Sequence, residues 1–216
     1  MTAKLLEGKK VSEAMLAKVK VDADHLRETG INPKLAIMRV GNDPGSISYE
    51  KSIIKRMAKS DIDVESKTFD SDITQSAFAT TLNTLNQNPQ IHSILIFKPL
   101  PPQLNMDQIK YMLDPNKDPD SLNPVNMGKL MLQDDKGFYP CTAEGVMKLL
   151  DYYHIDLKGK DVVIVNNSPV LGKPLSMMMT NRFATVTMVH VFTKNVAEYT
   201  KYADIVVSAA GIYGLI

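Results

Sequence analysis

The stretch Ile94-Leu95-Ile96-Phe97-Lys98-Pro99-Leu100-Pro101-Pro102 joins an apolar run to a basic residue and a proline-rich exit. An apolar run this short is typical of a strand that a parallel sheet buries on both faces. Proline cannot donate to a sheet ladder, so we expect the strand to end before Pro99. Ligands of open α/β sheets bind beyond the carboxyl ends of the strands. The stretch therefore predicts either the edge of a ligand site or only a core strand with a stiff exit.

The composition is that of an ordinary globular protein. The chain has 216 residues, of which 44% are hydrophobic and 23% charged, and its net charge is +1. This balance gives no electrostatic reason to expect nucleic acid or a membrane surface as partner. No apolar run approaches the roughly 20 residues that span a bilayer. The single cysteine, Cys141, excludes an intrachain disulfide and a cysteine-based zinc site, and the scattered histidines show no metal-ligand spacing. We therefore expect a protein of the reducing cytoplasm without a metal.

Strands and helices alternate in the first part of the chain, which favours a parallel α/β layer. We expect a first helix whose inner face carries Val11, Ala14, Met15, Val19 and Leu26, and which Gly30 ends. A second helix should start at Ser46 or Ser48, because serine is a good N-cap. The predicted strands are 35–40, 64–69 and 91–97, and the predicted helices are 10–29, 46–60, 74–86 and 106–112.

The second part repeats the alternation in the order of a nucleotide-binding half. Its predicted strands are 160–165, 185–190 and 204–209, and two of its helices are 142–153 and 195–202. A further helix follows the turn at 166–172, with Pro174 near its first turn, and continues over 175–180. Thr142 is the expected N-cap of helix 142–153. We place the domain boundary on this bridging helix, which gives domains 1–141 and 142–216.

The turn at 166–172 is a candidate cofactor site, because free amides at a helix start attract phosphate. Of the glycine-rich dinucleotide fingerprint only Gly172 is present, and no acidic residue or arginine follows the next strand. Tyr49 and Asp120 are candidates from the first domain. From residue type alone, Tyr49 fits a half-buried helix-start aromatic and Asp120 a solvated charged loop. Cys141 has no partner histidine and is interpreted as a packing residue.

Taken together, the segments resemble the methylenetetrahydrofolate dehydrogenase/cyclohydrolase family. The resemblance covers nearly the whole chain, and it depends on the order and spacing of motifs that are individually weak. The motifs are Tyr49 after Val40-Gly41, Pro99-Leu100-Pro101, Lys117-Asp118-Pro119-Asp120, 123–128, 140–142, 168–174, 184–187 and 203–207.

The resemblance implies two α/β domains with a cleft between them, folate against the first domain and NADP against a Rossmann-like second domain. It also implies a homodimer. A family tyrosine and aspartate fall on Tyr49 and Asp120, beside the Pro99-Leu100 exit. The family lysine that handles water in the cyclohydrolase step falls on Ile53, and its companion glutamine falls on Phe97. A branch of the family is similar in both respects. Arg56 or Lys98 could supply positive charge, although arginine is a poor proton shuttle. We expect Phe97 and Lys98 to face the folate side of the cleft.

The cofactor side also departs from the family. The Gly-Arg-Ser turn reads Asn166-Asn167-Ser168, and a Ser-Arg pair reads Val191-Phe192. Those arginines would pair with the 2′-phosphate of NADP, so NAD is an alternative cofactor. The resemblance assigns cofactor contacts to Asn166, Asn167, Ser168, Leu171, Gly172, Thr193, Ala209 and Gly211. The family continues beyond Gly211 with further strands, a binding loop and a helix, so we expect the sequence to be truncated or a fragment.

Three functional readings follow. The first is a folate dehydrogenase with weak or absent cyclohydrolase activity, since hydride transfer needs alignment more than a proton carrier. The second is a non-catalytic paralogue that still binds folate or a nucleotide. The third is an inactive fragment.

Overall fold

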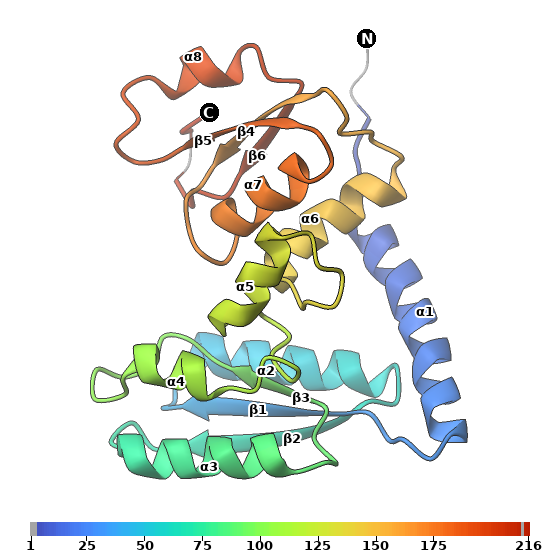
Figure 1. Ribbon diagram of the computed structural model, residues 1–216, viewed down its shortest axis with the longest axis vertical. Coiled ribbons are helices and arrows are strands. Elements are labelled where there is room, and N and C mark those ends of the chain that lie inside the picture. Colours follow the sequence, from blue (N-terminus) through green and yellow to red (C-terminus); the bar gives the residue numbers. More distant parts are fainter. Residues whose placement is uncertain (1–3, 213) are drawn as a thin grey trace. The chain divides into compact units, whose positions relative to one another are not determined.

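The computed structural model describes residues 4–212 and 214–216, and the chain forms two compact units (Figure 1). The N-terminal unit comprises residues 8–125, and the C-terminal unit comprises 126–216 with the described residues up to Glu7. The sequence placed the boundary later, between 141 and 142. Residues 126–141 group with the C-terminal unit because Leu130 is buried in that unit's core. Helix α6 (Cys141–Tyr152) likewise lies wholly in this unit.

The N-terminal unit is built on three parallel strands in the order β2-β1-β3. They are β1 (Lys34–Val40), β2 (Asp63–Phe69) and β3 (Ser93–Ile96). Strand β3 ends before Pro99, as the sequence predicts. Beyond its last residue the amide of Phe97 still donates to the carbonyl of Met38, at 2.9 Å. The exits of β1 and β3 are therefore held side by side.

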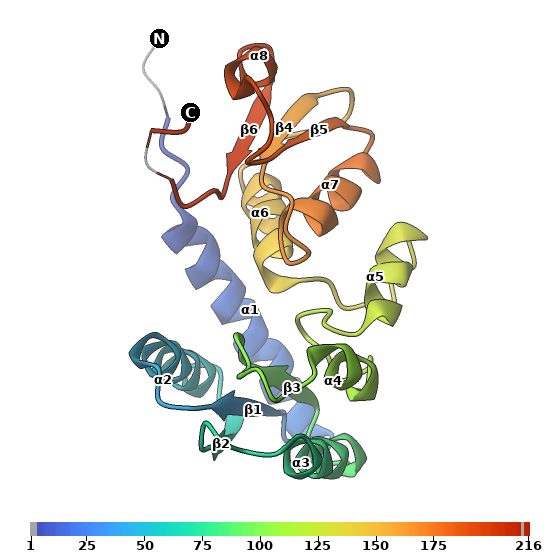
Figure 2. The same cartoon turned by 90° about the vertical axis from the view of Figure 1, so that its left-hand side faces the viewer.

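Alternation along β1 divides the two faces of this sheet. Ala36 and Met38 pack in an apolar cluster with helix α3 (Gln75–Gln87) and helix α4 (Met106–Met112). Phe78, Leu82 and Leu85 of α3 are buried, as the sequence predicts. Helix α2 (Pro44–Ala58) covers the opposite face of the sheet (Figures 1 and 2).

Helix α1 (Gly8–Glu28) differs from expectation in its burial. Of its residues, all described, only Val11 and Ala23 are buried, whereas Met15, Val19 and Leu26 are at least 37% exposed. Ala14 is exposed as well, so of the five residues predicted to share one apolar face only Val11 is buried. The helix also makes an ionic contact, in which Lys20 Nζ donates to Asp61 Oδ2 in the α2–β2 turn at 2.7 Å.

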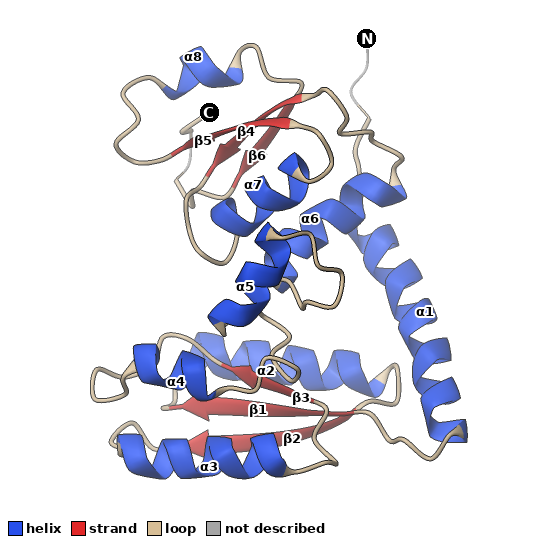
Figure 3. Ribbon diagram, in the orientation of Figure 1, coloured by secondary structure: helices blue, strands red, loops and turns tan. Residues whose placement is uncertain are grey.

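The C-terminal unit has a second parallel sheet in the order β5-β4-β6 (Figure 3). Along β4 (Asp161–Val165), Val162 and Ile164 join the core formed with α6 and α7 (Gly172–Thr180), while Val163 and Val165 face the opposite side. The sheet is therefore covered on both faces. Its strands are β4 (Asp161–Val165), β5 (Thr185–Val189) and β6 (Ile205–Ser208), and its further helices are α5 (Pro124–Met131), α7 (Gly172–Thr180) and α8 (Val196–Thr200).

Two predicted helix starts are wrong. Helix α2 is capped by Asp43, whose carboxylate accepts the Ser46 amide at 2.7 Å, and Pro44 occupies the first turn. Helix α6 begins at Cys141 after Pro140, so Thr142 is inside the helix and is not its cap. Cys141 is exposed, which contradicts the packing role expected for it. Among the helices in the described part of the chain, none has the length and apolarity to cross a bilayer.

The N-cap of α3 gives a direct stability test. Thr74 Oγ1 accepts the Ala77 amide at 3.2 Å, so Thr74→Ala should lower the free energy of unfolding by about 1 kcal/mol. The control is Thr80→Ala on the same helix. The Thr80 hydroxyl bonds only back to the Ser76 carbonyl, and we expect a neutral or slightly stabilising effect. Urea unfolding followed by circular dichroism measures both; equal losses would contradict the cap assignment.

Candidate functional site

The start of α2 places Tyr49 beside the exit of the central strand. Asp43 and Pro44 begin the helix directly after β1, and Tyr49 follows in the second turn. The hydrogen bond from the Ser46 amide holds the pKa of the Asp43 carboxyl below its usual value. The cap is therefore ionised at neutral pH, when it best stabilises the helix N-terminus.

Tyr49 and Phe97 are in aromatic contact. Their ring centroids lie 5.2 Å apart, with the planes tilted by 33°. Phe97 is 7% exposed, whereas Tyr49 is 59% exposed. The structure thus brings together two residues that the sequence singled out from different elements. Together they form an apolar surface with one phenol hydroxyl.

Ile53 and Arg56 lie further along α2. Ile53 follows Tyr49 by about one turn and is half-buried. Arg56 is exposed, and its guanidinium donates to Ser12 Oγ on α1. The Arg56 guanidinium is thus hydrogen-bonded to the neighbouring helix. Arg56 itself lies about two turns beyond Tyr49 on α2.

Lys98 and Asp120 form an ion pair in the same unit. Lys98 Nζ lies 3.9 Å from Asp120 Oδ2, and both side chains are partly exposed. Pro99 follows Lys98 through a cis peptide bond and is exposed. Leu100 is half-buried and packs against the apolar cluster that includes the buried residues of α3. The exit of β3 therefore carries a cation that faces the loop of Asp120.

Asp118 organises the loop that carries Asp120, a role that the charged residues of the loop did not predict. Asp118 is 1% exposed, and its carboxylate accepts the amides of Asp120 at 3.3 Å and Asn123 at 2.7 Å. Burial raises the pKa of Asp118, although these backbone hydrogen bonds oppose the rise. The only signal in the sequence was its position two residues before Asp120.

Lys117 fastens the same loop to α3. Its ammonium donates to the carbonyls of Leu85, Asn86 and Asn88 at 3.2, 2.7 and 2.8 Å. These carbonyls belong to the helix end, where backbone acceptors need partners from outside the helix. The position of Asp120 is thus set by contacts on both sides of it.

The candidate cofactor turn of the C-terminal unit is closed by its own hydrogen bonds. Asn166 Oδ1 accepts the amides of Ser168 and Gly172 at 2.8 and 3.1 Å, and Asn166 Nδ2 donates to the Ala209 carbonyl at 2.9 Å. Ser168 accepts the amides of Leu171 and Lys173. The expectation of free amides at the start of α7 is therefore wrong for residues 171–173. Asn167 lies in the same turn and is exposed.

The remaining predicted cofactor residues follow the other strands of this sheet. Thr193 comes after β5 and closes a turn in which its hydroxyl accepts the His190 amide at 3.0 Å. Ala209 and Gly211 come directly after β6, and Gly211 has φ +63°. All these positions lie at the carboxyl edge of a parallel sheet, where such folds bind nucleotides.

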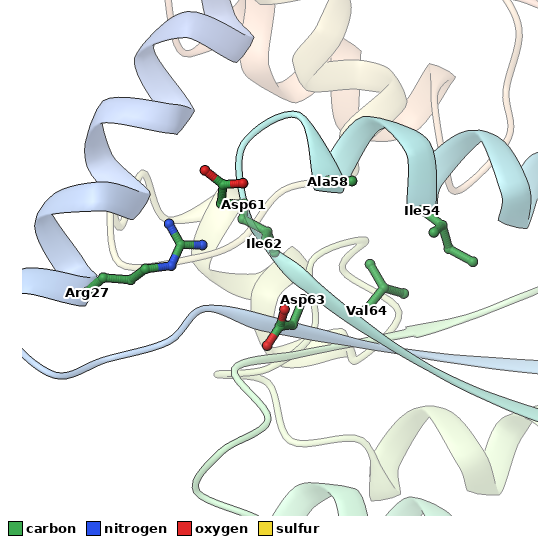
Figure 4. A pocket seen from close by; sticks show the side chains of 7 residues that line it. All are labelled: Arg27, Ile54, Ala58, Asp61, Ile62, Asp63 and Val64. Atoms are coloured by element: carbon green, nitrogen blue, oxygen red, sulfur yellow. The ribbon is translucent and has the colours of Figure 1, made fainter.

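A cavity of about 450 Å³ lies elsewhere in the N-terminal unit (Figure 4). Asp63 is the first residue of β2, so the cavity is at the amino edge of the sheet, opposite Tyr49 and Phe97. It contains none of the predicted site residues. Its lining residues are Arg27, Ile54, Ala58, Asp61, Ile62, Asp63 and Val64. No group of three or more metal-ligating side chains occurs within residues 4–212 and 214–216.

These features are those of a protein with two α/β units, the second of which has the parallel sheet of nucleotide-binding folds. Residues 6–120 match the family described as "Tetrahydrofolate dehydrogenase/cyclohydrolase, catalytic domain", and residues 140–216 match its "NAD(P)-binding domain". The chain belongs to the tetrahydrofolate dehydrogenase/cyclohydrolase family, as its resemblance predicted.

Individual relatives agree with this assignment. "Bifunctional protein FolD" of Alkaliphilus oremlandii is 45% identical over 211 residues, which is 96% of this chain and 73% of the relative. The crystal structure of the Campylobacter jejuni FolD dehydrogenase/cyclohydrolase has a TM-score of 0.96 at 38% identity, and covers 99% of this chain and 76% of that one. The Trypanosoma brucei FolD, solved with NADP and an inhibitor, has a TM-score of 0.94 at 32% identity, covering 100% and 75%.

Gly172 offers a sharp test of the cofactor turn. A Cβ at this position would lie 2.2 Å from the Asn166 carbonyl oxygen, a backbone atom that cannot move by side-chain rotation. Gly172→Ala should therefore lower the free energy of unfolding by about 1–3 kcal/mol.

The matched control is Gly145→Ala in the exposed middle of α6, where a Cβ would meet no atom within 4 Å. It should stabilise the protein by roughly 0.5–1 kcal/mol, since alanine is the better helix former. Thermal unfolding of both variants checks the pair. Similar behaviour of the two glycine variants would show that the close approach at Gly172 does not constrain the turn.

Proposed function

We propose that this protein oxidises 5,10-methylenetetrahydrofolate to 5,10-methenyltetrahydrofolate with NADP, and that its hydrolysis of the methenyl product is weak or absent. The observation that carries the proposal is the aromatic contact of Tyr49 with Phe97. Ile53 follows Tyr49 by about one turn on α2. The two rings provide an aromatic surface against which folate could pack. Ile53 and Phe97 provide no group that could carry a proton.

Hydride transfer asks little acid–base chemistry of the protein. The hydride leaves the methylene carbon for the nicotinamide ring, and the iminium cation that remains is the product. Alignment of the two carbons is the main requirement. Asp120 would hold the polar edge of the pterin, and its loop is fixed by Asp118 and Lys117. Tyr49, Pro99 and Leu100 would complete the folate site.

Hydrolysis has a different requirement. A water oxygen must bond to the methenyl carbon, and a base must take the proton that the water loses. Ile53 and Phe97 can neither donate nor accept a proton. Arg56 stays protonated and is engaged with Ser12, while Lys98 pairs with Asp120. Arg56 and Lys98 are thus poorly suited to replace the missing lysine.

NADP would bind along the carboxyl edge of the second sheet. The family's second domain binds NAD(P), and the related Trypanosoma brucei protein was solved with NADP. The contacts that we assign to the cofactor share this edge of the sheet and are Asn166, Asn167, Ser168, Leu171, Gly172, Thr193, Ala209 and Gly211. NAD is the alternative cofactor, because Asn167 and Phe192 replace the expected arginines. We place the protein in the cytoplasm because it has a single cysteine, and we infer a homodimer from the family resemblance.

The proposal predicts the activity of the purified protein. With 5,10-methylenetetrahydrofolate, reduced cofactor should accumulate with NADP, while added 5,10-methenyltetrahydrofolate should disappear little or no faster than in buffer. The absorbance of the reduced cofactor measures the oxidation rate, and the loss of methenyl absorbance measures the hydrolysis rate. The oxidation is also measured with NAD in place of NADP. Folate binding by calorimetry without turnover would instead support a non-catalytic binding protein.

The double variant Ile53→Lys/Phe97→Gln tests the cause of the lost hydrolysis. It restores a cation and an amide at positions near Tyr49, so methenyl hydrolysis should rise roughly 10–100-fold. The control is Ile54→Lys, which adds the same charge one residue further along α2, where it points elsewhere. An unchanged hydrolysis rate in the double variant, or an equal rise in the control, would reject the explanation.

A further inference from the structure

Arg39 and Glu50 form a buried ion pair between the central strand and α2. Arg39 Nε lies 2.5 Å from Glu50 Oε2, and the side chains are only 10% and 8% exposed. The guanidinium also donates to the Gly41 carbonyl at the exit of β1. Burial opposes ionisation of Glu50, but hydrogen bonds from Ser66 and Arg39 outweigh it and hold the pKa of Glu50 below its usual value.

The pair ties the buried residue of α2 to the central strand of the sheet. Among the residues of α2, all of which the structure describes, Glu50 alone is buried. Other helices of the unit use apolar anchors, such as Phe78 and Leu82 in α3. Desolvating two charges is expensive, and apolar residues often fill such a place with equal stability. What the pair adds is direction, since Glu50 must face both Arg39 on β1 and Ser66 on β2.

The direction of Glu50 sets the direction of Tyr49. Adjacent residues of an α-helix point about 100° apart, so a helix that turns Glu50 toward β1 turns Tyr49 to a fixed angle from it. At that angle the Tyr49 ring meets Phe97, which follows β3. An apolar residue in place of Glu50 would tolerate several rotations of α2, because apolar contacts are not directional.

We propose that Arg39 and Glu50 are positioning residues that fix the Tyr49 ring over Phe97 and thereby align the folate substrate. This inference rests on the proposed function for the role of Tyr49 in folate binding. The contact between the two rings can be tested without it.

The decisive variant is Arg39→Met/Glu50→Leu, which removes both charges and keeps the volume apolar. We expect an unfolding temperature close to that of the wild type. We expect kcat/KM for 5,10-methylenetetrahydrofolate to fall by about 10–100-fold, with the KM for NADP within about twofold. Glu50→Gln alone should lower the unfolding temperature by roughly 10 °C, because Arg39 is then buried without a counter-charge.

A second measurement follows Tyr49 directly. The protein is labelled with 3-fluorotyrosine, and Tyr49→Phe assigns the Tyr49 fluorine resonance. The double variant should move this resonance toward the value of a solvent-exposed fluorotyrosine. The control is Arg182→Met/Asp151→Leu, which removes an ion pair of the C-terminal unit. In that pair Arg182 Nη2 donates to Asp151 Oδ2 at 3.1 Å. This control should change neither the resonance nor the folate KM.

The outcomes separate the two proposals. If the wild type does not turn over folate but the double variant shifts the Tyr49 resonance, the proposed function fails and the positioning of the ring stands. If the wild type is active and the double variant keeps both the resonance and kcat/KM, the positioning role is wrong. If the double variant does not fold, Ser66→Ala replaces it, because this substitution removes only a hydrogen bond to Glu50. A smaller shift of the Tyr49 resonance and a raised KM for folate would support the positioning role. An unchanged resonance and an unchanged KM would overturn it.

Discussion

The hydrogen bond from the Phe97 amide to the Met38 carbonyl joins the exits of β1 and β3. It is the last link of a parallel pair that begins at Leu35 and Ser93. Because both strands run in the same direction, everything that follows them in sequence starts from the same edge. Tyr49 arrives from the loop after β1, and Lys98 follows β3 directly. A shift of this register by one residue would turn Phe97 to the other face of the sheet.

The site of the N-terminal unit is supported by polar contacts more than by apolar ones. Asp118 accepts hydrogen bonds from backbone amides, and Lys117 donates to backbone carbonyls. Arg39 donates to a carboxylate and to a carbonyl. Such bonds are directional, so they fix loops and helix starts that apolar packing would leave loosely defined. The residues that would meet folate are in part exposed, and their precision depends on these buried neighbours.

Local chemistry explains what the sequence could predict. The end of β3 follows from the inability of proline to join a ladder, and the inner face of α3 follows from a three- and four-residue apolar period. The start of α2 was misplaced although Pro44 marked it, since proline is favoured in a first helical turn. The exposure of α1 could not be predicted, because periodicity shows which residues share a face but not what covers it. The pairing of Arg39 with Glu50 depends on the crossing of a strand and a helix, which no local pattern encodes.

The close approach of Gly172 to the Asn166 carbonyl has a consequence for how this sequence can change over time. The Asn166 side chain accepts the Gly172 amide, and the Asn166 backbone leaves no room for a side chain at 172. Neither position can therefore drift alone: a larger residue at 172 requires a differently shaped turn, and a new turn releases the amides that Asn166 now occupies. Substitutions that alter how this turn meets a nucleotide must be inherited as a set.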